Sequence, residues 1–398
     1  MPLAPLIVLL VLLPAAAATA LTLPSWLVSG RARKQPVAAA ALKKVQMGEF
    51  TGGTGGSSQR AVQAELESAH EFQITSGQAE FVISGASVGG RLTGRVMDSS
   101  GKRLLERTYA APGLDENARA FADDVILAIT GKPGLATSRI AFVSDKSGVR
   151  QVYLSDPEGR EVFQVTHHRH GAVSPTLNSD ASAVAYTSYR SGFPVVQWLD
   201  LGQGWERTVT DTSGSSFGAA FSPDGQRLAM VMSFLGNPEV FVTDLNTNTA
   251  ACISDTTGVP GSPSWHPDGR QVIFSDDRGQ GPALYVAEVP ETNQSQASLV
   301  RWRTGYRFST DPEFSPDGQS VAFTARSGGH LAVVVKGWPN GHARVIQAGG
   351  AAHPSWSPNG RYVCYTQHGV LYVHHLTSGH RRAILEKQGR ISEPRWMK

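Results

Sequence analysis

Apolar and polar positions follow a repeating order from about residue 138 to the end of the chain. Six triplets of the same kind recur between polar turns. In each triplet an apolar residue is followed by a second residue, which is usually small, and then by an aromatic or similarly large one. These triplets are Ile140–Phe142, Val184–Tyr186, Leu228–Met230, Val272–Phe274, Val321–Phe323 and Val363–Tyr365. Short apolar runs bounded by turn residues are typical of β-strands. The pattern therefore predicts six copies of one small β-sheet.

A turn motif recurs with the same period. Its copies are Phe221-Ser-Pro-Asp-Gly225, Trp265-His-Pro-Asp-Gly269, Phe314-Ser-Pro-Asp-Gly318 and Trp356-Ser-Pro-Asn-Gly360, with a weaker copy at Leu177–Asp180 and a truncated one at Pro394–Trp396. The leading residues are 44, 44, 49, 42 and 40 positions apart. A repeat of roughly 40 to 50 residues is typical of four-stranded propeller blades. Because Pro, Asp and Gly each favour a tight turn, we interpret Asp224, Asp268 and Asp317 as structural.

The first and last copies of the repeat are each incomplete. The copy that begins at Ser138 lacks a preceding aromatic strand, and Trp396 has no strands after it. Pairing of Ser392–Trp396 with Ser138–Ser144 would close the ring and remove an open sheet edge. We therefore predict an all-β six-bladed β-propeller over residues 138–398.

A small α+β domain is expected at residues 59–134, before the propeller. Its predicted elements are a helix at Gln59–His70, strands at Glu80–Ile83, Gly90–Met97 and Arg103–Tyr109, and a helix at Glu116–Thr130. Asp115 is the expected cap of the second helix, and Gly131 its expected end. Residues 21–58 are expected to form a flexible N-terminal segment, because Val45–Ser58 is polar and rich in glycine.

The first 20 residues have the pattern of a signal peptide. An apolar run at Leu3–Leu13 is followed by Ala18-Thr-Ala20, which fits the small-residue rule for cleavage. We therefore expect export to the periplasm and no membrane span after cleavage. A second apolar stretch, Leu21–Val28, leaves an uncleaved membrane anchor as the alternative.

Composition excludes some classes of protein. The 42 Gly, 23 Pro and only 17% charged residues suit a turn-rich β protein. A net charge of +3, without a stripe of Lys or Arg interleaved with aromatics, argues against nucleic-acid binding. The only two cysteines, Cys252 and Cys364, do not make a disulfide framework.

Two motifs resemble chemical sites. Gly85-Ala-Ser-Val-Gly89 matches the nucleophile elbow of hydrolases, but it lies between two predicted strands, so Ser87 is expected to be a loop residue. His167-His-Arg-His170 and the pair His374-His375 have no carboxylate or cysteine at the spacing of a metal site. We therefore expect no catalytic residues, no metal and no cofactor.

The chain resembles the TolB family. The resemblance rests on Ala122–Gly131, on Ser138–Val143, on the six blade motifs and on the terminal Glu393-Pro-Arg-Trp396, and it covers Gln59–Lys398. It implies a non-catalytic periplasmic scaffold of the Tol-Pal system, which supports envelope integrity and cell division. In that family the extreme N-terminus of the mature protein engages TolA, so a TolA-like protein is a second expected partner, although Leu21–Pro36 shows no clear counterpart of that segment.

The expected partner site lies at one mouth of the ring. Loops that precede the first strand of each blade gather there, and loops on a rigid scaffold commonly carry function. By resemblance, this mouth holds the peptidoglycan-associated lipoprotein Pal. The matching positions are Ser216, Gly261, Thr310, Asp311, His353 and Glu393. Two alternatives remain: a small-ligand-binding propeller, and the propeller of a peptidase, which would need a hydrolase domain that is not expected because only Met397 and Lys398 follow Trp396.

Overall fold

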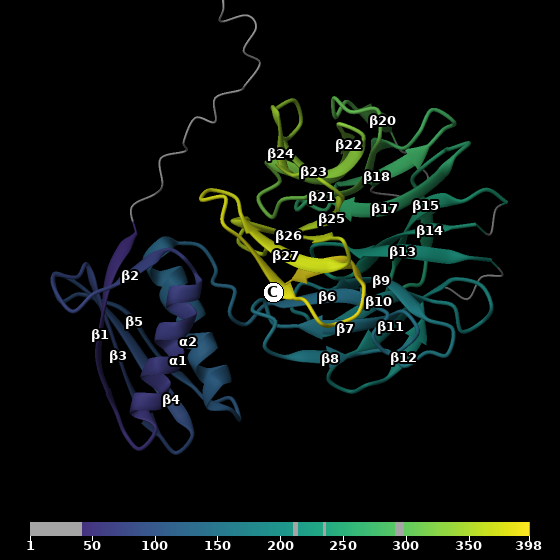
Figure 1. Cartoon of the computed structure of the whole chain (residues 1–398). Coiled ribbons are helices and arrows are strands. Elements are labelled where there is room, and N and C mark those ends of the chain that lie inside the picture. The colour runs from purple at the N-terminus through teal and green to yellow at the C-terminus, as the bar shows by residue number, and fades with distance from the viewer. Residues whose placement is uncertain (1–41, 210–213, 234–235, 291–297, 398) are drawn as a thin grey trace, which may run out of the picture. The chain divides into compact units, whose positions relative to one another are not determined.

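A computed structural model describes residues 42–209, 214–233, 236–290 and 298–397. The expected signal peptide and cleavage site therefore lie outside the described residues. The described chain begins with one mixed sheet and two helices, which are followed by six four-stranded antiparallel sheets arranged as a propeller (Figure 1). The prediction of a small α+β domain before a six-bladed propeller is confirmed.

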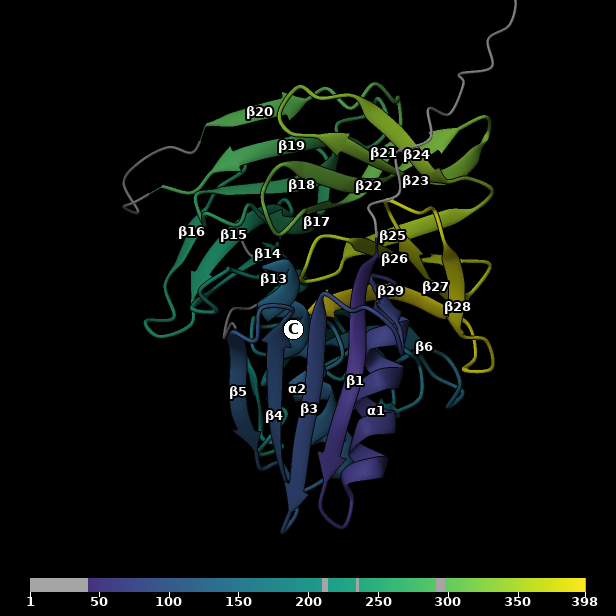
Figure 2. The same cartoon turned by 90° about the vertical axis from the view of Figure 1, so that its left-hand side faces the viewer.

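The small domain is a five-stranded sheet with both helices on one face (Figure 2). Its strand order is β2-β1-β3-β4-β5. The elements are β1 (Lys43–Thr51), α1 (Gly55–Ser68), β2 (Phe72–Ile74), β3 (Phe81–Val88), β4 (Arg91–Asp98), β5 (Arg103–Tyr109) and α2 (Leu114–Thr130). Phe121 of α2 packs so closely on β4 that a Cβ at Gly94 would lie 2.4 Å from its ring. A residue without a side chain is therefore required at that point of the sheet.

Two expectations for this domain need correction. The segment expected to be flexible contains β1, which lies inside the sheet between β2 and β3 and buries Val45 and Phe50. The domain therefore begins by Lys43 rather than at Gln59. Pairing with two neighbouring strands stabilises β1, although its own sequence has only a weak alternation of apolar and polar residues. The cap of α2 is Gly113 rather than Asp115, whereas Gly131 ends the helix in the left-handed conformation, as expected.

The propeller blades contain four strands each. Blade 1 consists of β29 (Ile391–Met397), β6 (Arg139–Ser144), β7 (Gln151–Ser155) and β8 (Val162–Gln164); blade 2 of β9 (Ala172–Leu177), β10 (Ala183–Ser188), β11 (Val195–Asp200) and β12 (Glu206–Thr208); blade 3 of β13 (Ser216–Phe221), β14 (Arg227–Met232), β15 (Glu239–Asp244) and β16 (Ala250–Cys252). Blade 4 consists of β17 (Val259–Trp265), β18 (Gln271–Asp277), β19 (Ala283–Glu288) and β20 (Leu299–Trp302); blade 5 of β21 (Ser309–Phe314), β22 (Ser320–Ser327), β23 (His330–Gly337) and β24 (Ala343–Gln347); blade 6 of β25 (Ala351–Trp356), β26 (Tyr362–Gln367), β27 (Val370–His375) and β28 (Arg381–Leu385).

The ring closes as predicted. Strand β29 at the end of the chain pairs antiparallel with β6, so the yellow C-terminal strand lies beside the first propeller strand in Figure 1. Trp396 is only 2% exposed, and its indole N–H donates to Ser138 Oγ at 2.9 Å. Closure leaves no unpaired inner strand among the described blades.

The repeated turns are structural. In the third and fifth blades, the Ser hydroxyl donates to the Asp carboxylate two residues on, as from Ser315 to Asp317 at 2.6 Å. The glycines that end these turns, Gly225 and Gly318 among them, have φ near +70°. Apolar side chains of neighbouring blades then pack against each other, as Phe221 does with Val196 and Ala185 of the preceding blade.

Candidate functional site

Each innermost strand contains a β-bulge at the same point of the repeat. The bulged residue stands three positions before the leading aromatic residue, or before Leu177 in blade 2, and has a positive φ of 50° to 63°. Ladder register shifts mark the same point in all six strands. We call these residues the channel ring: Ser174, Gly218, Ser262, Asp311, His353 and Glu393. Bulges commonly re-aim a side chain, and here all six residues line one cavity of about 210 Å³ together with Arg395.

Three of the six residues predicted for the partner site belong to the channel ring, namely Asp311, His353 and Glu393. The other three lie one or two positions earlier on their strands. Ser216 is buried, and its Oγ accepts from the Val196 N–H at 2.9 Å. Gly261 accepts the Ser275 hydroxyl through its carbonyl, and Thr310 donates to Asp311 at 3.0 Å. None of these three lines the cavity.

Three members of the channel ring, Ser174, Gly218 and Ser262, were not predicted from the sequence. A usable signal existed, because all six members occupy the same position relative to the leading residue of the repeat. Four members of the channel ring form hydrogen bonds with each other across blades. Ser174 donates to Glu393 Oε2 through its N–H at 2.6 Å and its hydroxyl at 3.0 Å, and Ser262 donates to Asp311 at 3.1 Å. These bonds fix both carboxylates at the wall of the channel.

A second ring of residues lies two positions further along each inner strand. At three of these positions, Ser264, Glu313 and Ser355, the side chain accepts the backbone N–H of the next blade's aromatic residue, as Ser355 Oγ does from Trp396 at 2.9 Å. Glu313 accepts in the same way from Trp356 at 2.8 Å, and it pairs with Arg395 at 3.0 Å. Burial raises the pKa of the Glu313 carboxyl, and Arg395 opposes this shift. The ion pair joins blade 5 to blade 1 past the intervening blade 6.

A second hollow of the channel is lined mainly by aromatic residues and prolines, with Glu313 and Arg395 also in its wall. The leading aromatic residues and the prolines of the repeated turns enclose a volume of about 320 Å³ there. Trp265, Trp356 and Trp396 belong to this wall, and the indole N–H groups of the first two donate to backbone carbonyls of the preceding blade. The channel therefore has one hollow lined by the channel ring and one dominated by aromatic rings, and Arg395 lines both.

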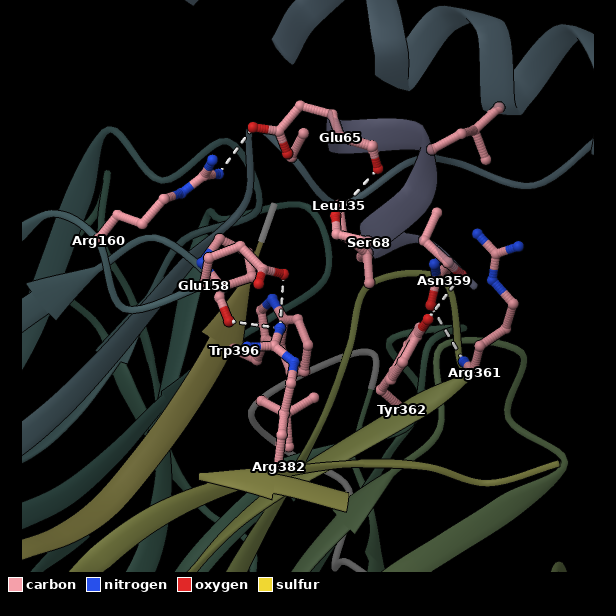
Figure 3. A pocket seen from close by; sticks show the side chains of 15 residues that line it. Glu65, Ser68, Leu135, Glu158, Arg160, Asn359, Arg361, Tyr362, Arg382 and Trp396 are labelled. Carbon is pink, nitrogen blue, oxygen red and sulfur yellow. Dashed lines mark hydrogen bonds and ion pairs between the residues drawn. The ribbon is translucent and has the colours of Figure 1, made fainter. Parts of the chain in front are cut away.

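A separate pocket lies where α1 and α2 meet blades 1 and 6 (Figure 3). Its wall contains acids and arginines that pair with each other. Arg160 donates a hydrogen bond to Glu65 at 2.7 Å, and Glu158 forms an ion pair with Arg382. Burial raises the pKa of the Glu65 carboxyl, and the hydrogen bond from Arg160 opposes this shift. Because these acids and arginines pair with each other, we interpret the pocket as the junction that connects the small domain to the propeller.

Two further contacts support this interpretation. The Tyr362 hydroxyl donates to the Ala69 carbonyl at the end of α1 at 2.8 Å, and Arg361 pairs with Glu71. Burial lowers the pKa of the Arg361 guanidinium. Removing one partner from such a buried pair lowers the stability of the fold. We therefore interpret these groups as structural rather than as ligand-binding.

Other residues singled out in the sequence have structural surroundings. Ser87 lies within β3, neither in the expected loop nor in a strand-to-helix turn, and its hydroxyl shares a hydrogen bond with Ser58 at 2.7 Å. A ring nitrogen of His168 bonds the Tyr186 hydroxyl at 2.8 Å. Cys252 and Cys364 are both free. Within the described ranges, no three His, Cys, Asp or Glu residues are grouped as a metal site would require, and no helix is long and apolar enough to cross a membrane.

Comparisons with known proteins agree on one family. The family model described as the TolB beta propeller domain matches residues 127–398. A "Protein TolB homolog" of Chlorobaculum tepidum is 32% identical over 143 residues, which cover 35% of this chain and 32% of that protein. A "Tol-Pal system protein TolB" of Desulfotalea psychrophila is 32% identical over 133 residues, which cover 33% and 30% of the two chains. The matched segments thus span about a third of the length of these relatives.

A solved structure extends the similarity to nearly the whole fold. TolB from Acinetobacter baumannii superposes with a TM-score of 0.75 at 23% identity, covering 90% of this chain and 97% of that one. At this identity the superposition demonstrates the fold alone. Together with a family match over more than half of the residues, the geometry of the six blades leads to one conclusion: this chain belongs to the TolB β-propeller family.

Proposed function

We propose that this protein is an exported, non-catalytic scaffold of the Tol-Pal type, and that the hollow lined by its channel ring binds a peptidoglycan-associated lipoprotein. The observation that carries the proposal is the channel ring. Six bulges turn one residue from each blade into a common cavity, and three of these residues are Asp311, His353 and Glu393. Family membership supports the choice of partner.

The channel ring is already organised before a partner arrives. Its backbone belongs to paired strands of a closed propeller, and hydrogen bonds from Ser174 and Ser262 hold the carboxylates of Glu393 and Asp311. A pre-ordered surface loses little conformational entropy on binding. Carboxylates at the wall of a narrow cavity are partly removed from water, where charged hydrogen bonds are stronger than at an exposed rim. A partner that presents Lys, Arg or backbone N–H groups fits this chemistry.

The rival classes have less support. The nucleophile elbow of an α/β-hydrolase needs a strand-to-helix turn, whereas Ser87 lies inside a strand and its hydroxyl shares a hydrogen bond with Ser58. A small-ligand propeller would use the same cavity, so the two readings differ in what the cavity binds. Residues 1–41 lie outside the described structure, so export, cleavage after Ala20 and contact with a TolA-like protein stay proposals.

The test is binding of the Pal-like protein from the same organism. We would replace Asp311, His353 and Glu393 together by Ala and measure affinity by calorimetry. The matched control replaces one residue of each same type outside the cavity, namely Asp255, His330 and Glu386, all of which are exposed. We expect the channel variant to bind at least about tenfold more weakly, because loss of one or more desolvated charged contacts exceeds about 1.4 kcal/mol.

The control variant should keep a melting temperature close to that of the wild type, because exposed substitutions usually change stability by about 0.5 kcal/mol or less. The channel variant should unfold at a somewhat lower temperature but remain folded at the temperature of the assay, because it removes the hydrogen bonds from Ser174 and Ser262. Equal affinities of the two triple variants would place the partner elsewhere. If the wild type bound no Pal-like protein, the scaffold proposal itself would fail.

A further inference from the structure

A hollow of about 370 Å³ lies between blades 4 and 5, outside the inner strands of the propeller. One side is a face of blade 4 that extends to its outermost strand, β20 (Figure 2), and the other is the turn that follows β23 in blade 5. Val286, Glu288, Val300, Trp302, Trp338 and Asn340 line this blade 4–5 groove. Its volume falls within the range of about 300 to 1,000 Å³ that is usual for small-molecule sites.

The floor and one wall of the groove are apolar. The strand ladder pairs Val286 with Val300 and places Trp302 two residues further along, so the three side chains lie on the same face of blade 4. Val300 is 60% exposed, so the floor is open to solvent. The Trp338 ring of blade 5 lies 5.4 Å from the Trp302 ring, centroid to centroid, and also lines the groove. A ligand can therefore reach an apolar floor beside two indole rings.

The indole wall is fixed in place by contacts within the protein. The Trp302 indole N–H donates to the Pro339 carbonyl at 2.6 Å, and Lys336 Nζ lies 5.1 Å from the centroid of the Trp302 ring. The Trp338 ring meets the Phe314 ring edge-on, with centroids 5.0 Å apart. A wall that is ordered in advance loses little conformational entropy when a ligand binds.

The acid of the groove lacks the structural role that its repeat position has in other blades. Glu288 is the fourth acid in a series spaced at 44 residues, after Asp156, Asp200 and Asp244. In those three, a carboxylate oxygen accepts a backbone N–H from the turn that follows, as Asp244 does from Asn246 at 2.9 Å. Within the described ranges, the exposed Glu288 carboxylate accepts no hydrogen bond and forms no ion pair. It is therefore available to a ligand.

Neutral polar side chains stand beside this acid. Gln271 is the ladder partner of Glu288, and Ser298 and Asn340 are both exposed. In the part of the chain that the structure describes, none of these three neutral side chains forms a hydrogen bond with the protein. Each amide offers two N–H donors and a carbonyl acceptor. The groove therefore has unused donors and acceptors next to its indole wall.

We propose that the blade 4–5 groove binds a saccharide. A sugar ring combines an apolar face of C–H groups with hydroxyls that both donate and accept hydrogen bonds, which matches indole rings bordered by amides and a carboxylate. A purely apolar ligand would bury Glu288 and the amides without partners, which is costly. An organic cation would lie beside Arg301 and Arg303, which line the groove and form no ion pair in the described structure. The same arginines suit a saccharide that carries a carboxylate.

The groove is separate from the proposed partner site. It is built from β18, β19, β20 and the turn after β23, whereas the channel ring belongs to the inner strands. Saccharide binding should therefore be unchanged in the variant that replaces Asp311, His353 and Glu393 by Ala. The failure of either proposal would leave the other intact.

Calorimetry with two tetrasaccharides tests the groove directly. One is N-acetylated chitotetraose, which is neutral, and the other is a hyaluronan tetrasaccharide, which carries carboxylates. The variant Glu288→Ala with Asn340→Ala should bind saccharide at least about tenfold more weakly, because two hydrogen-bonding groups are lost. Both side chains are exposed, so the variant should remain folded. The matched control, Glu386→Ala with Asn237→Ala, changes exposed residues of the same types elsewhere and should bind like the wild type.

A second variant probes the indole wall. Trp338→Leu keeps an apolar side chain against Phe314 but removes the flat ring, and it should weaken saccharide binding at least about fivefold. The matched control is Trp205→Leu, which removes an indole that is 46% exposed in blade 2. Thermal unfolding followed by circular dichroism checks that both variants fold. If Trp338→Leu does not fold, the variant at Glu288 and Asn340 decides.

The two probes also define the saccharide. Tighter binding of the hyaluronan fragment assigns a carboxylated saccharide to the groove, and equal or tighter binding of chitotetraose assigns a neutral one. The proposal is overturned if neither probe binds. It is also overturned if the groove variants and their controls bind alike, because the saccharide would then lie elsewhere, such as in the aromatic hollow of the channel.

Discussion

Replacing Trp396 by Ala probes how ring closure stabilises the fold. Trp396 lies on the last strand, is 2% exposed and packs with Ile140 of the first propeller strand and with Tyr362 of blade 6. Its indole also donates to Ser138 Oγ. The variant therefore opens a cavity at the seam between the first and last blades without cutting the chain.

The expected cost in the free energy of unfolding is about 4 to 6 kcal/mol. Removing a fully buried large aromatic side chain costs about 3 to 5 kcal/mol, because both burial and packing are lost. A lost internal hydrogen bond contributes about 1 kcal/mol more. Since domains of ordinary stability unfold with about 5 to 15 kcal/mol, the variant should still fold at low temperature.

The assay is urea unfolding followed by circular dichroism, with Trp205→Ala as the matched control. Trp205 is 46% exposed and rests on Trp198 with ring centroids 4.8 Å apart, so its removal should cost no more than about 1 kcal/mol. Deletion of residues 391–398 should destabilise more than Trp396→Ala, because it also removes the ladder to β6. If Trp396→Ala costs no more than the control, the closure reasoning is refuted.

Two further predictions concern charged and titratable groups in the propeller. Arg395→Ala should lower the free energy of unfolding in urea by about 2 to 4 kcal/mol, because it leaves the largely buried Glu313 carboxylate without its ion-pair partner. Adding Glu313→Gln should recover part of this loss. Additive costs of the two substitutions would argue against the ion pair. The pKa of His374 is lowered from 6.5 to about 4, so the unfolded chain takes up its proton first and stability is lost as pH falls from 6.5 to 4, by up to about 3 kcal/mol. Unfolding of wild type and His374→Asn at pH 7.5 and 4.5 checks this, and an identical loss in both would contradict it.

The repeat made most of the propeller predictable. Strand and turn signals are local properties of a few residues, and six copies of the same signal reinforce one another. Closure followed as well, because the fragments at Ser138 and Trp396 complement each other. The small domain was predicted less completely. Strand β1 is largely polar and a glycine-rich segment follows it, so its place in the sheet depends on pairing with β2 and β3.

The sequence predicted the six candidate partner residues in loops before the inner strands, whereas the structure places all of them within those strands. Asp311, His353 and Glu393 line the channel cavity, and Ser216, Gly261 and Thr310 do not. Alternation along a strand gives the facing of each side chain only while the ladder is regular. The bulge adds a residue and reverses the facing beyond it, and the bulge itself is visible only in the paired structure.

By itself, then, the sequence determined the number of blades, the turns and the way the ring closes, because these depend on short-range patterns that recur along the chain. Tertiary structure alone decided which charges meet. Arg160 reaches Glu65 across 95 positions, and Arg395 reaches Glu313 across 82. Such long-range pairs are invisible in the sequence, since the energy of a charge depends on its neighbours in space and on its burial.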